Sequence, residues 1–384
     1  MIWLAVICLG TLLIYTLLLI VLRSRFLKLK PFASNQEPST YPFITVIVPA
    51  RNEALNIGRL IATIQNTDYP KENYEIIVAD DFSTDGTAEI CSTFKNVNVI
   101  SLKDHIHGHL NSYKKKGIEL AIKKAKGNII VCTDADCVVP PGWLKTITLF
   151  YQEKQPVFVA MPVRMQEGRS FLSRLQSMDF LSLQGVSAAC AGSKIMMCNG
   201  ANLSYTHTAF DAVDGFSGID EIASGDDMLL MHKIEGAFSG KVAYLFSKDV
   251  IVDTMPERTW KGFLMQRIRW ASKSKTYKHS QIKAVLALVY AVNLFLLTFF
   301  MACFFMPEIP ISNMHVFSFL LWVILLIIKV IAELIFLFPV ATFFSRKRSL
   351  LWFPMMQPFH ILYTVIAGTL GNFGTYQWKG RTVK

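Results

Sequence analysis

Several features typical of secreted, zinc-binding or disulfide-rich proteins are missing from this sequence. Its 7 cysteines include no CxxC spacing, so neither a disulfide framework nor a zinc site is indicated. No Lys or Arg precedes the first apolar run, whereas a cleavable signal peptide carries its positive charges before the apolar core. The alternating His105, His107 and His109 have a single acid beside them, Asp104, and are interpreted as an exposed loop rather than metal ligands.

The chain is instead rich in apolar residues and positive charge. Its 384 residues are 52% hydrophobic, with a formal net charge of +11 and a mean hydropathy of +0.36. These values are too apolar for an ordinary soluble domain, yet the central part carries charges that must contact water. A membrane-anchored enzyme fits both facts, and no nucleic acid partner is expected.

The first apolar run, residues 2–22, is long enough to cross a bilayer. It is followed by the basic residues Arg23, Arg25, Lys28 and Lys30. We interpret it as an uncleaved anchor, and the positive-inside rule then places the region after it in the cytoplasm. The expected location is a bacterial inner membrane.

Two further spans are predicted at residues 284–305 and 316–344, joined by a short loop without Lys or Arg. Arg346, Lys347 and Arg348 then return the chain to the cytoplasmic side. Within the second of these spans Lys329 and Glu333 stand four residues apart, so mutual neutralisation is the default interpretation and a lipid-headgroup contact the alternative.

The last apolar stretch, residues 350–370, is harder to interpret because it contains Pro354, Pro358 and His360. A plain crossing would leave the basic tail residues outside, against the charge rule: Lys379, Arg381 and Lys384. The sequence therefore favours a broken, re-entrant or interfacial segment over a plain span.

The middle of the chain alternates strand and helix signals. Apolar strand-like runs occupy residues 43–48, 74–80, 96–101 and 128–136, and helical patterns occupy 53–66, a segment beginning near Thr84, and 112–126. Such alternation predicts an α/β fold with a doubly wound, mostly parallel sheet. Residues 156–260 are less regular, as expected of acceptor-side loops with a few mixed strands.

Carboxylates follow two of these strands directly. Asp80 ends the run YEIIVAD and Asp81 comes next, and Asp134 and Asp136 follow the run NIIVC. Because parallel strands present their carboxyl ends at one edge of the sheet, where ligands bind, these acids indicate a nucleotide and metal site. Their hard oxygens suit Mg²⁺ or Mn²⁺. Helix capping is the plainer alternative for Asp80 and Asp81.

The ordered motifs VIVPARNEA, VADDFSTDGT, TDADC, GDD and QRIRW resemble those of the family 2 inverting glycosyltransferases of the GT-A fold, over roughly residues 41–270. The resemblance implies that Asp134 and Asp136 coordinate Mg²⁺ or Mn²⁺ bridging a nucleotide diphosphate. It also implies that the nucleotide-sugar contacts Asp134 and the residues Pro49, Arg51, Asn52, Glu53, Asp80, Asp81 and Lys116. A simple helix start for 49–53 and a solvated helix face for Lys115 and Lys116 remain alternatives.

For the acceptor side, the resemblance implies that Asp227 of Gly225-Asp226-Asp227 is the general base. Asp226 stands where the family more often has Glu, and a helix N-cap is the alternative for either Asp. Asn199 and Gly200 match an acceptor-side loop. Gln266, Arg269 and Trp270 of QRIRW are expected to line the site, with the Arg near the diphosphate and the Trp at the acceptor end. A membrane-surface helix is the alternative for this segment.

The expected organisation is an anchor at 1–30, a cytoplasmic catalytic domain at 41–260, an interfacial amphipathic helix at 261–280 and a membrane region at 281–384. The expected activity is inverting transfer of a sugar from a nucleotide-sugar, with a UDP-sugar favoured, to a lipid or lipid-linked acceptor at the inner membrane face. A processive polysaccharide synthase that exports its product remains an alternative. A non-catalytic nucleotide-sugar-binding scaffold is the third, and the presence of every acidic motif together with QRIRW argues against it.

Overall fold

The computed structural model describes residues 2–33, 36–108, 110–222, 225–273, 276–277, 279–311, 314–373, 376–378 and 381–383. Of the residues discussed above, His109, Lys379 and Lys384 lie outside these ranges. The chain divides into two compact units. We call Met1–Leu29, Glu167–Ala189 and Pro256–Tyr376 the helical unit, and Lys30–Gln166, Cys190–Met255 and Gln377–Lys384 the sheet unit.

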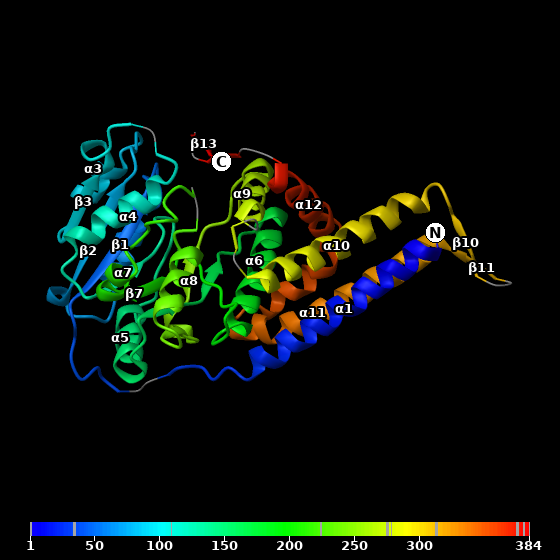
Figure 1. The fold of residues 1–384 in the computed structure, drawn as a ribbon, viewed down its shortest axis with the longest axis horizontal. Coiled ribbons are helices and arrows are strands. Elements are labelled where there is room, and N and C mark those ends of the chain that lie inside the picture. Colours follow the sequence, from blue (N-terminus) through cyan, green and yellow to red (C-terminus); the bar gives the residue numbers. More distant parts are fainter. Residues whose placement is uncertain are drawn as a thin grey trace. The chain divides into compact units, whose positions relative to one another are not determined.

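The sheet unit is built on a seven-stranded sheet in the order β3-β2-β1-β4-β7-β5-β8 (Figure 1). The strands are β1 (Ile44–Ala50), β2 (Tyr74–Asp80), β3 (Val97–Ser101), β4 (Ile129–Cys132), β5 (Phe158–Ala160), β7 (Leu203–Thr206) and β8 (Val242–Tyr244). β1 pairs in parallel with both β2 and β4, β2 pairs in parallel with β3, and β7 runs antiparallel to its neighbours. The predicted α/β fold with a mostly parallel sheet is confirmed.

β1, β2 and β4 are mostly apolar and buried along nearly their whole length, as expected of strands covered on both faces. The helices of this unit are α2 (Ile57–Gln65), α3 (Thr87–Ser92), α4 (Tyr113–Lys124), α5 (Trp143–Lys154), α7 (His207–Ala212) and α8 (Met228–Ala237). α4 packs against β1, β2 and β3 (Figure 1). β6 (Val163–Met165) and β9 (Val252–Thr254) form a separate parallel pair. Since β1 lies between β2 and β4, the strand order reverses at β1, where open α/β sheets bind ligands.

The helical unit contains the long helices α1 (Ile2–Leu27), α6 (Phe171–Ala189), α9 (Trp260–Ser272), α10 (Ser280–Cys303), α11 (Ser318–Phe343) and α12 (Phe353–Phe373). The hairpin β10 (Glu308–Ile311) and β11 (Met314–Phe317) joins α10 to α11, and the 3₁₀ element η5 (Lys347–Trp352) joins α11 to α12. Among the described residues, four helical segments are long and apolar enough to cross a membrane: Ile2–Leu27, Ser280–Cys303, Ser318–Phe343 and Lys347–Gly371.

Of the forms expected for 350–370, a broken segment is wrong, whereas a re-entrant or interfacial segment stays a prediction. α12 is one continuous helix although it contains Pro358. Pro354 lies in the first turn, where a backbone N–H would have no intrahelical partner. Pro358 follows one turn later, so its missing N–H removes a single helical hydrogen bond near the helix start. The two prolines therefore mark the beginning of the helix rather than a break within it.

The catalytic domain was expected to be continuous over residues 41–260. Residues 167–189, which include α6, instead group with the helical unit. Gly185 permits close packing there: a Cβ at this position would lie 2.7 Å from Cγ2 of Val340 and 3.0 Å from the ring of Phe336. The helix also buries polar side chains, Gln176 and Gln184, so its sequence does not look like that of a membrane helix.

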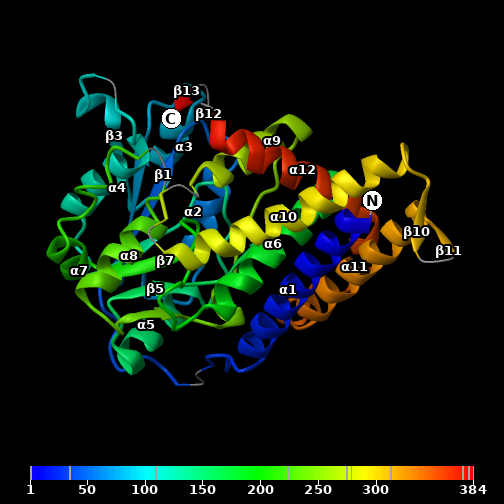
Figure 2. The same ribbon diagram turned by 45° about the vertical axis from the view of Figure 1, so that its right-hand side comes forward.

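α1 and α11 run in the same direction. The Phe26 and Phe343 rings, near the last turns of the two helices, lie 6.5 Å apart. At the other end, the N-terminal end of α1 lies beside the β10–β11 hairpin in both views (Figures 1 and 2). The basic residues that end α1 and those that follow α11 therefore come to the same end of this unit.

Four polar side chains form a closed network among α1, α11 and α12. Lys329 Nζ lies 2.7 Å from Oε1 of Glu333 and donates to Oε1 of Gln357 at 2.6 Å. The Gln357 amide donates to the other Glu333 oxygen at 2.9 Å, and Tyr15 donates to Glu333 at 2.8 Å. Mutual neutralisation of Lys329 and Glu333, the default expectation, is confirmed.

All seven cysteines are free. Burial raises the pKa of Cys91 to about 11 and that of Cys132 to about 12. These two thiols are therefore protonated at neutral pH and act as small packing groups rather than nucleophiles.

Candidate active site

The carboxyl ends of β1 and β2 are tied together. The backbone N–H of Asp81 donates to the carbonyl of Ala50 at 2.8 Å. Arg51 then reaches across, donating from Nη1 to the Asp81 carbonyl at 2.8 Å, with its guanidinium 3.6 Å from the Asp81 carboxylate. Two of the predicted nucleotide-binding residues, Arg51 and Asp81, are thus in contact at the edge of the sheet.

The loops that follow these strands are joined by side-chain hydrogen bonds. Asn52 adopts a left-handed backbone, with φ of 51°, and its side-chain oxygen accepts from the N–H of Thr84 at 2.9 Å. The N–H of Glu53 donates to the Thr87 hydroxyl at 2.8 Å. Asn is among the residues that best tolerate this backbone region. The helix predicted from residue 53 accordingly begins only at Ile57.

Asp85 organises the second of these loops. Its carboxylate accepts from the N–H of Ala54 at 2.9 Å and from both the N–H and the hydroxyl of Thr87 at 3.1 and 2.5 Å. Desolvation acts to raise the pKa of Asp85, but these hydrogen bonds to the charged form outweigh it and hold the pKa below its usual value. Asp85 belongs to the motif VADDFSTDGT but is not among the predicted site residues.

Asp80 has one carboxylate oxygen that is not satisfied. Its side chain is buried, with 4% of the residue exposed, and Oδ2 accepts weakly from the N–H of Ser83 at 3.3 Å. Oδ1 has no hydrogen-bond partner within the described ranges. An acceptor oxygen left in this state is costly, so it marks a place where a ligand group or cation is to be expected.

The centre of the site is a lysine held between two acids. Lys114 Nζ lies 2.8 Å from Oδ1 of Asp134 and 2.9 Å from Oδ2 of Asp226. Burial alone would lower the pKa of Lys114, but the two carboxylates outweigh this and hold the pKa well above its ordinary value. The fold thus brings together Asp134 and Asp226, which are 92 positions apart (226 − 134) in the sequence. We call Lys114, Asp134 and Asp226 the Lys114 cluster.

Gly200 and Asp227 complete this region. The Gly200 N–H donates to Oδ2 of Asp227 at 3.1 Å, and Met228 N–H donates to Oδ1 of Asp227 at 2.7 Å. A Cβ on Gly200 would lie 3.2 Å from Lys114 Nζ and 3.3 Å from Oδ2 of Asp226, so glycine permits the close approach. Asp227 is also the N-cap of α8, which was the plainer interpretation of this residue. The two backbone hydrogen bonds fix its carboxylate beside the cluster.

Asp136, Asn199 and Pro49 lie in surrounding elements. Oδ2 of Asp136 accepts from the Thr254 hydroxyl at 3.1 Å, which links it to β9. Asn199 accepts from the N–H of Ala201 at 2.9 Å and so shapes the turn that presents Gly200. Pro49 stands in β1 opposite Ala79 of β2.

Lys116 is not brought to this site in the structure, because its ammonium pairs with Glu119 on the same helix at 2.8 Å. Lys115 is buried and donates to the carbonyls of Ile219 and Ile222 at 2.6 and 2.7 Å.

Lys114 is the functional candidate that sequence reasoning missed. At 100° per residue, Lys114 lies at the centre of the arc formed by the buried residues of α4, whereas Lys116 lies opposite. The position of each lysine around the helix could therefore have distinguished Lys114 from Lys116.

The QRIRW segment lies on α9 in the helical unit, where Arg267 makes the strongest contacts. Its Nη2 lies 2.6 Å from Oδ2 of Asp179, and its guanidinium lies 4.3 Å from the centre of the Trp270 ring. Arg267 also donates to the Gln266 side chain at 2.5 Å. Tyr363 on α12 donates to the other oxygen of Asp179 at 2.5 Å. Sequence reasoning singled out Arg269, which is half-buried, and missed Arg267 and Asp179.

Mg²⁺ or Mn²⁺ is the cation that the resemblance implies. Within the described parts of the chain, no group of three or more His, Cys, Asp or Glu side chains is arranged to hold a metal ion. Mg²⁺ commonly takes only one or two protein carboxylates, with phosphates and water supplying the other ligands. Asp134, Asp136 and the unsatisfied Oδ1 of Asp80 offer such oxygens at one edge of the sheet. The residues present therefore fit a divalent cation held largely by phosphates.

Comparison with known families and curated proteins gives partial matches. A family model described as glycosyl transferase family 2 matches residues 45–214. Glycosyltransferase AglE of Haloferax volcanii is 35% identical over 28% of this chain and 34% of its own length. Beta-monoglucosyldiacylglycerol synthase of Synechocystis sp. is 30% identical over 32% of this chain and 26% of its own length. The match to this chain thus spans about a third or less of the length of these curated relatives.

Among solved structures, mannosyltransferase PcManGT from Pyrobaculum calidifontis, in complex with GDP-Man and Mn²⁺, covers 97% of this chain and 97% of its own. The TM-score is 0.56 and the sequence identity 19%. This likeness concerns the fold, and it extends over both the sheet unit and the helices.

Proposed function

Because residues 45–214 of this chain form a glycosyl transferase family 2 domain, we propose that the protein transfers a sugar from a nucleotide-sugar to a lipid or lipid-linked acceptor, with inversion at the anomeric carbon. The observation that carries the proposal is the Lys114 cluster beside Asp227, to which Asp134 contributes just after the carboxyl end of β4. In this proposal the sheet unit is the catalytic part and the helical unit holds it at the membrane.

The donor is bound by the loops after β1 and β2. The nucleoside is surrounded by Pro49, Arg51, Asn52, Glu53, Asp80 and Asp81. Hydrogen bonds between the two loops keep these groups in place before the donor binds. Lys114 contributes a positive charge next to the diphosphate. A UDP-sugar is the donor class we favour.

Asp134 and Asp136 would hold the divalent cation, and when bound this cation neutralises negative charge on the departing nucleoside diphosphate. Lys114 keeps Asp134 oriented, because its ammonium is shared between Asp134 and Asp226. Asp226 thereby acts on the diphosphate side of the site through Lys114. The solved neighbour in complex with Mn²⁺ supports the choice of cation.

Asp227 is the general base. It removes the proton of the acceptor hydroxyl as the oxygen attacks the anomeric carbon from the face opposite the leaving group. The new carbon–oxygen bond forms as the bond to the diphosphate oxygen breaks, and the proton resides on the Asp227 carboxylate. The N–H groups of Gly200 and Met228 hold that carboxylate in one orientation during the transfer.

A lipid acceptor is supported by the helical unit, whose described residues include four apolar helices, with basic residues gathered at one end. The Synechocystis relative, a synthase of a diacylglycerol glycolipid, provides a precedent for such an acceptor. Gln266, Arg269 and Trp270 of α9 are proposed to line the site on the acceptor and diphosphate side. The basic end of the helical unit faces the cytoplasm in this proposal.

The experiment is to incubate purified full-length protein with a panel of nucleotide-sugars and a membrane lipid extract. Released nucleoside diphosphate and the mass of the extracted lipid product are both measured. One or a few sugars added to a lipid support the proposal, whereas a long glycan would favour a processive synthase. Donor binding without any released diphosphate across the panel and the extract would favour the non-catalytic scaffold.

Orientation is tested separately by labelling single cysteines from outside intact cells, in a background without the native cysteines. Ser312 falls in the part of the chain that the structure does not describe, so Glu308→Cys in β10 serves for the outer loop, and Ser39→Cys serves for the inner side. Both positions are exposed. Labelling of Glu308→Cys alone is expected, and labelling of Ser39→Cys would overturn the orientation.

A further inference from the structure

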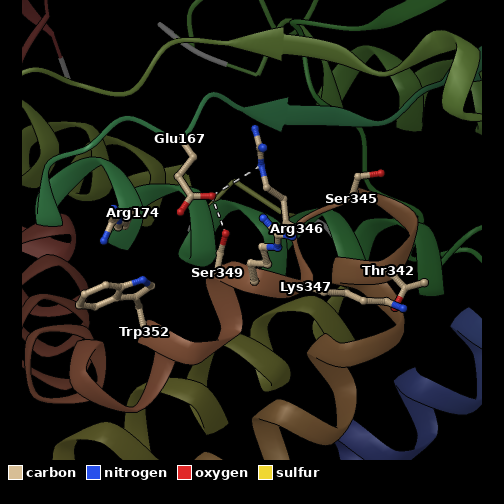
Figure 3. Close-up of a pocket in the computed structure, with 9 residues that line it drawn as sticks. Glu167, Arg174, Thr342, Ser345, Arg346, Lys347, Ser349 and Trp352 are labelled. Atoms are coloured by element: carbon tan, nitrogen blue, oxygen red, sulfur yellow. Dashed lines mark hydrogen bonds and ion pairs between the residues drawn. The ribbon is translucent and has the colours of Figure 1, made fainter.

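A basic pocket in the helical unit follows the end of α11 (Figure 3). Its volume is about 720 Å³. The residues that give it its character are Arg174 on α6, Arg346, Lys347 and Arg348 after α11, Glu167, and Trp352. Four positive charges against one carboxylate leave a net charge of +3 on its lining (4 − 1).

Glu167 lines the pocket and contacts two of its other lining residues. Its Oε2 accepts from the buried Ser349 hydroxyl at 2.5 Å and lies 3.8 Å from Nε of Arg346 (Figure 3). Ser345 has a φ of 58°, a left-handed conformation that reverses the chain just after α11. Arg346 is therefore held beside Glu167, while Lys347 and Arg348 remain exposed.

The other three cations of the lining are not neutralised. Across the residues the structure describes, Arg174, Lys347 and Arg348 form no ion pair with an acid. Arg174 lies over the Trp352 ring at 4.6 Å, and Lys347 lies 5.5 Å from the centre of the Phe338 ring. Aromatic faces hold these side chains in position but leave their charges available to an anion.

Exposed apolar side chains lie in the segment that supplies Ser349 and Trp352 to the pocket. Leu351 is 82% exposed, Met355 61% and Trp352 40%, and all three lie in η5 or the first turn of α12. α11, which leads into the pocket, is long and apolar enough to cross a membrane. A basic hollow with an exposed apolar rim at the end of such a helix matches a ligand with a charged head and a hydrocarbon tail. A soluble phosphate compound would use the cations but not the rim.

We propose that this pocket binds the phosphate headgroup of an anionic membrane lipid. Arg174, Lys347 and Arg348 contact the phosphate, and Leu351, Trp352 and Met355 contact the first part of the acyl chains. The site holds the end of α11 and the η5 element at the membrane surface. Its occupation requires no sugar transfer, so it stands independently of the function proposed above.

The test uses full-length protein in phosphatidylcholine nanodiscs and measures the binding of a fluorescent phosphatidylglycerol. Arg174→Gln should weaken binding about fivefold, because one basic residue near an anionic headgroup contributes about that factor. The double variant Lys347→Gln/Arg348→Gln should weaken it more than tenfold. Arg174→Lys, which keeps the charge, should retain most of the binding and so separates loss of charge from misfolding.

The matched control is Lys123→Gln/Lys124→Gln, which removes the same charge from the exposed end of α4 in the sheet unit. It should leave binding unchanged, and an equal loss in this control would assign the effect to net charge and overturn the pocket. In a further arm, inorganic phosphate is added at the same concentration as the lipid. Failure to displace the lipid supports a lipid site, whereas full displacement would overturn it in favour of a soluble phosphate ligand.

Discussion

Lys114 Nζ lies 2.8 Å from Oδ1 of Asp134, so a fixed positive charge stands against an acid of the proposed donor site. Asp226 shares the same ammonium at 2.9 Å. Without this lysine, the two acids would stand in a partly buried site with no positive charge between them. Two carboxylates close enough to share one ammonium repel each other. Lys114 is thus the residue that allows Asp134 and Asp226 to be close together before any ligand binds.

Replacing Lys114 with Gln should reduce nucleotide-sugar turnover on the order of 10²-fold, since it removes a positioned charge at the diphosphate. Lys116→Gln is the matched control on the same helix, and it should change turnover by no more than about twofold because Lys116 pairs with Glu119. Released nucleoside diphosphate is measured as a function of donor concentration. Equal losses in the two variants would contradict the role assigned to Lys114.

The pKa of Lys114 sets the pH range over which the cluster is intact. Because the folded-state pKa is raised, the stabilisation is fully present below the ordinary lysine value of 10.5 and is lost only as pH rises through the raised value. The difference in melting temperature between wild type and Lys114→Gln should therefore stay constant from about pH 6 to pH 9. A difference that shrinks toward pH 9 would mean that Lys114 loses its proton there.

The sheet could be predicted from the sequence because buried parallel strands are mostly apolar runs, as in β1 and β2. The acids at the strand ends could be predicted for the same reason. Lys114 could not be separated from its two neighbouring lysines by residue type, since only the helical phase distinguishes them. Its partner Asp226 lies in a segment far from it in the sequence, and the motifs give no distance between such remote segments.

The helical unit was less predictable. α6 lies between strands of the sheet unit in the sequence and mixes buried Gln176 and Gln184 with apolar residues, so neither hydropathy nor spacing assigns it to the helical unit. The prolines of α12 suggested a break because their position relative to the helix start was unknown. The importance of Arg267 rests on Asp179, which is supplied by α6.

Asp227→Asn should lower the transfer rate by about 10² to 10⁴-fold, the usual contribution of a general base, while nucleotide-sugar binding survives. Asn keeps an acceptor oxygen for the Met228 N–H and is a good N-cap, so α8 should remain folded. Rate and donor affinity are measured separately, by single turnover and by calorimetry. Loss of donor binding with an unchanged rate per bound donor would instead make Asp227 a donor ligand.

Removal of divalent cations should abolish turnover, because Asp134 and Asp136 add negative charge near a diphosphate leaving group and cannot neutralise it. Excess chelator is added, and activity is then titrated back with Mg²⁺ or Mn²⁺. Asp136→Asn should raise the cation concentration needed for half-maximal rate. Full turnover in excess chelator would rule out the proposed cation.

The network of Lys329, Glu333, Gln357 and Tyr15 predicts how the helical unit responds to loss of one charge. Glu333→Gln leaves the Lys329 ammonium buried with no carboxylate partner, which should destabilise the unit by about 3 kcal/mol. The double variant Lys329→Met/Glu333→Gln is neutral, and it keeps an acceptor for Tyr15 and a partner for Gln357. It should therefore be more stable than Glu333→Gln alone, as measured by unfolding in mixed detergent micelles. A double variant less stable than the single one would mean that the Lys329 charge is stabilised by something other than Glu333.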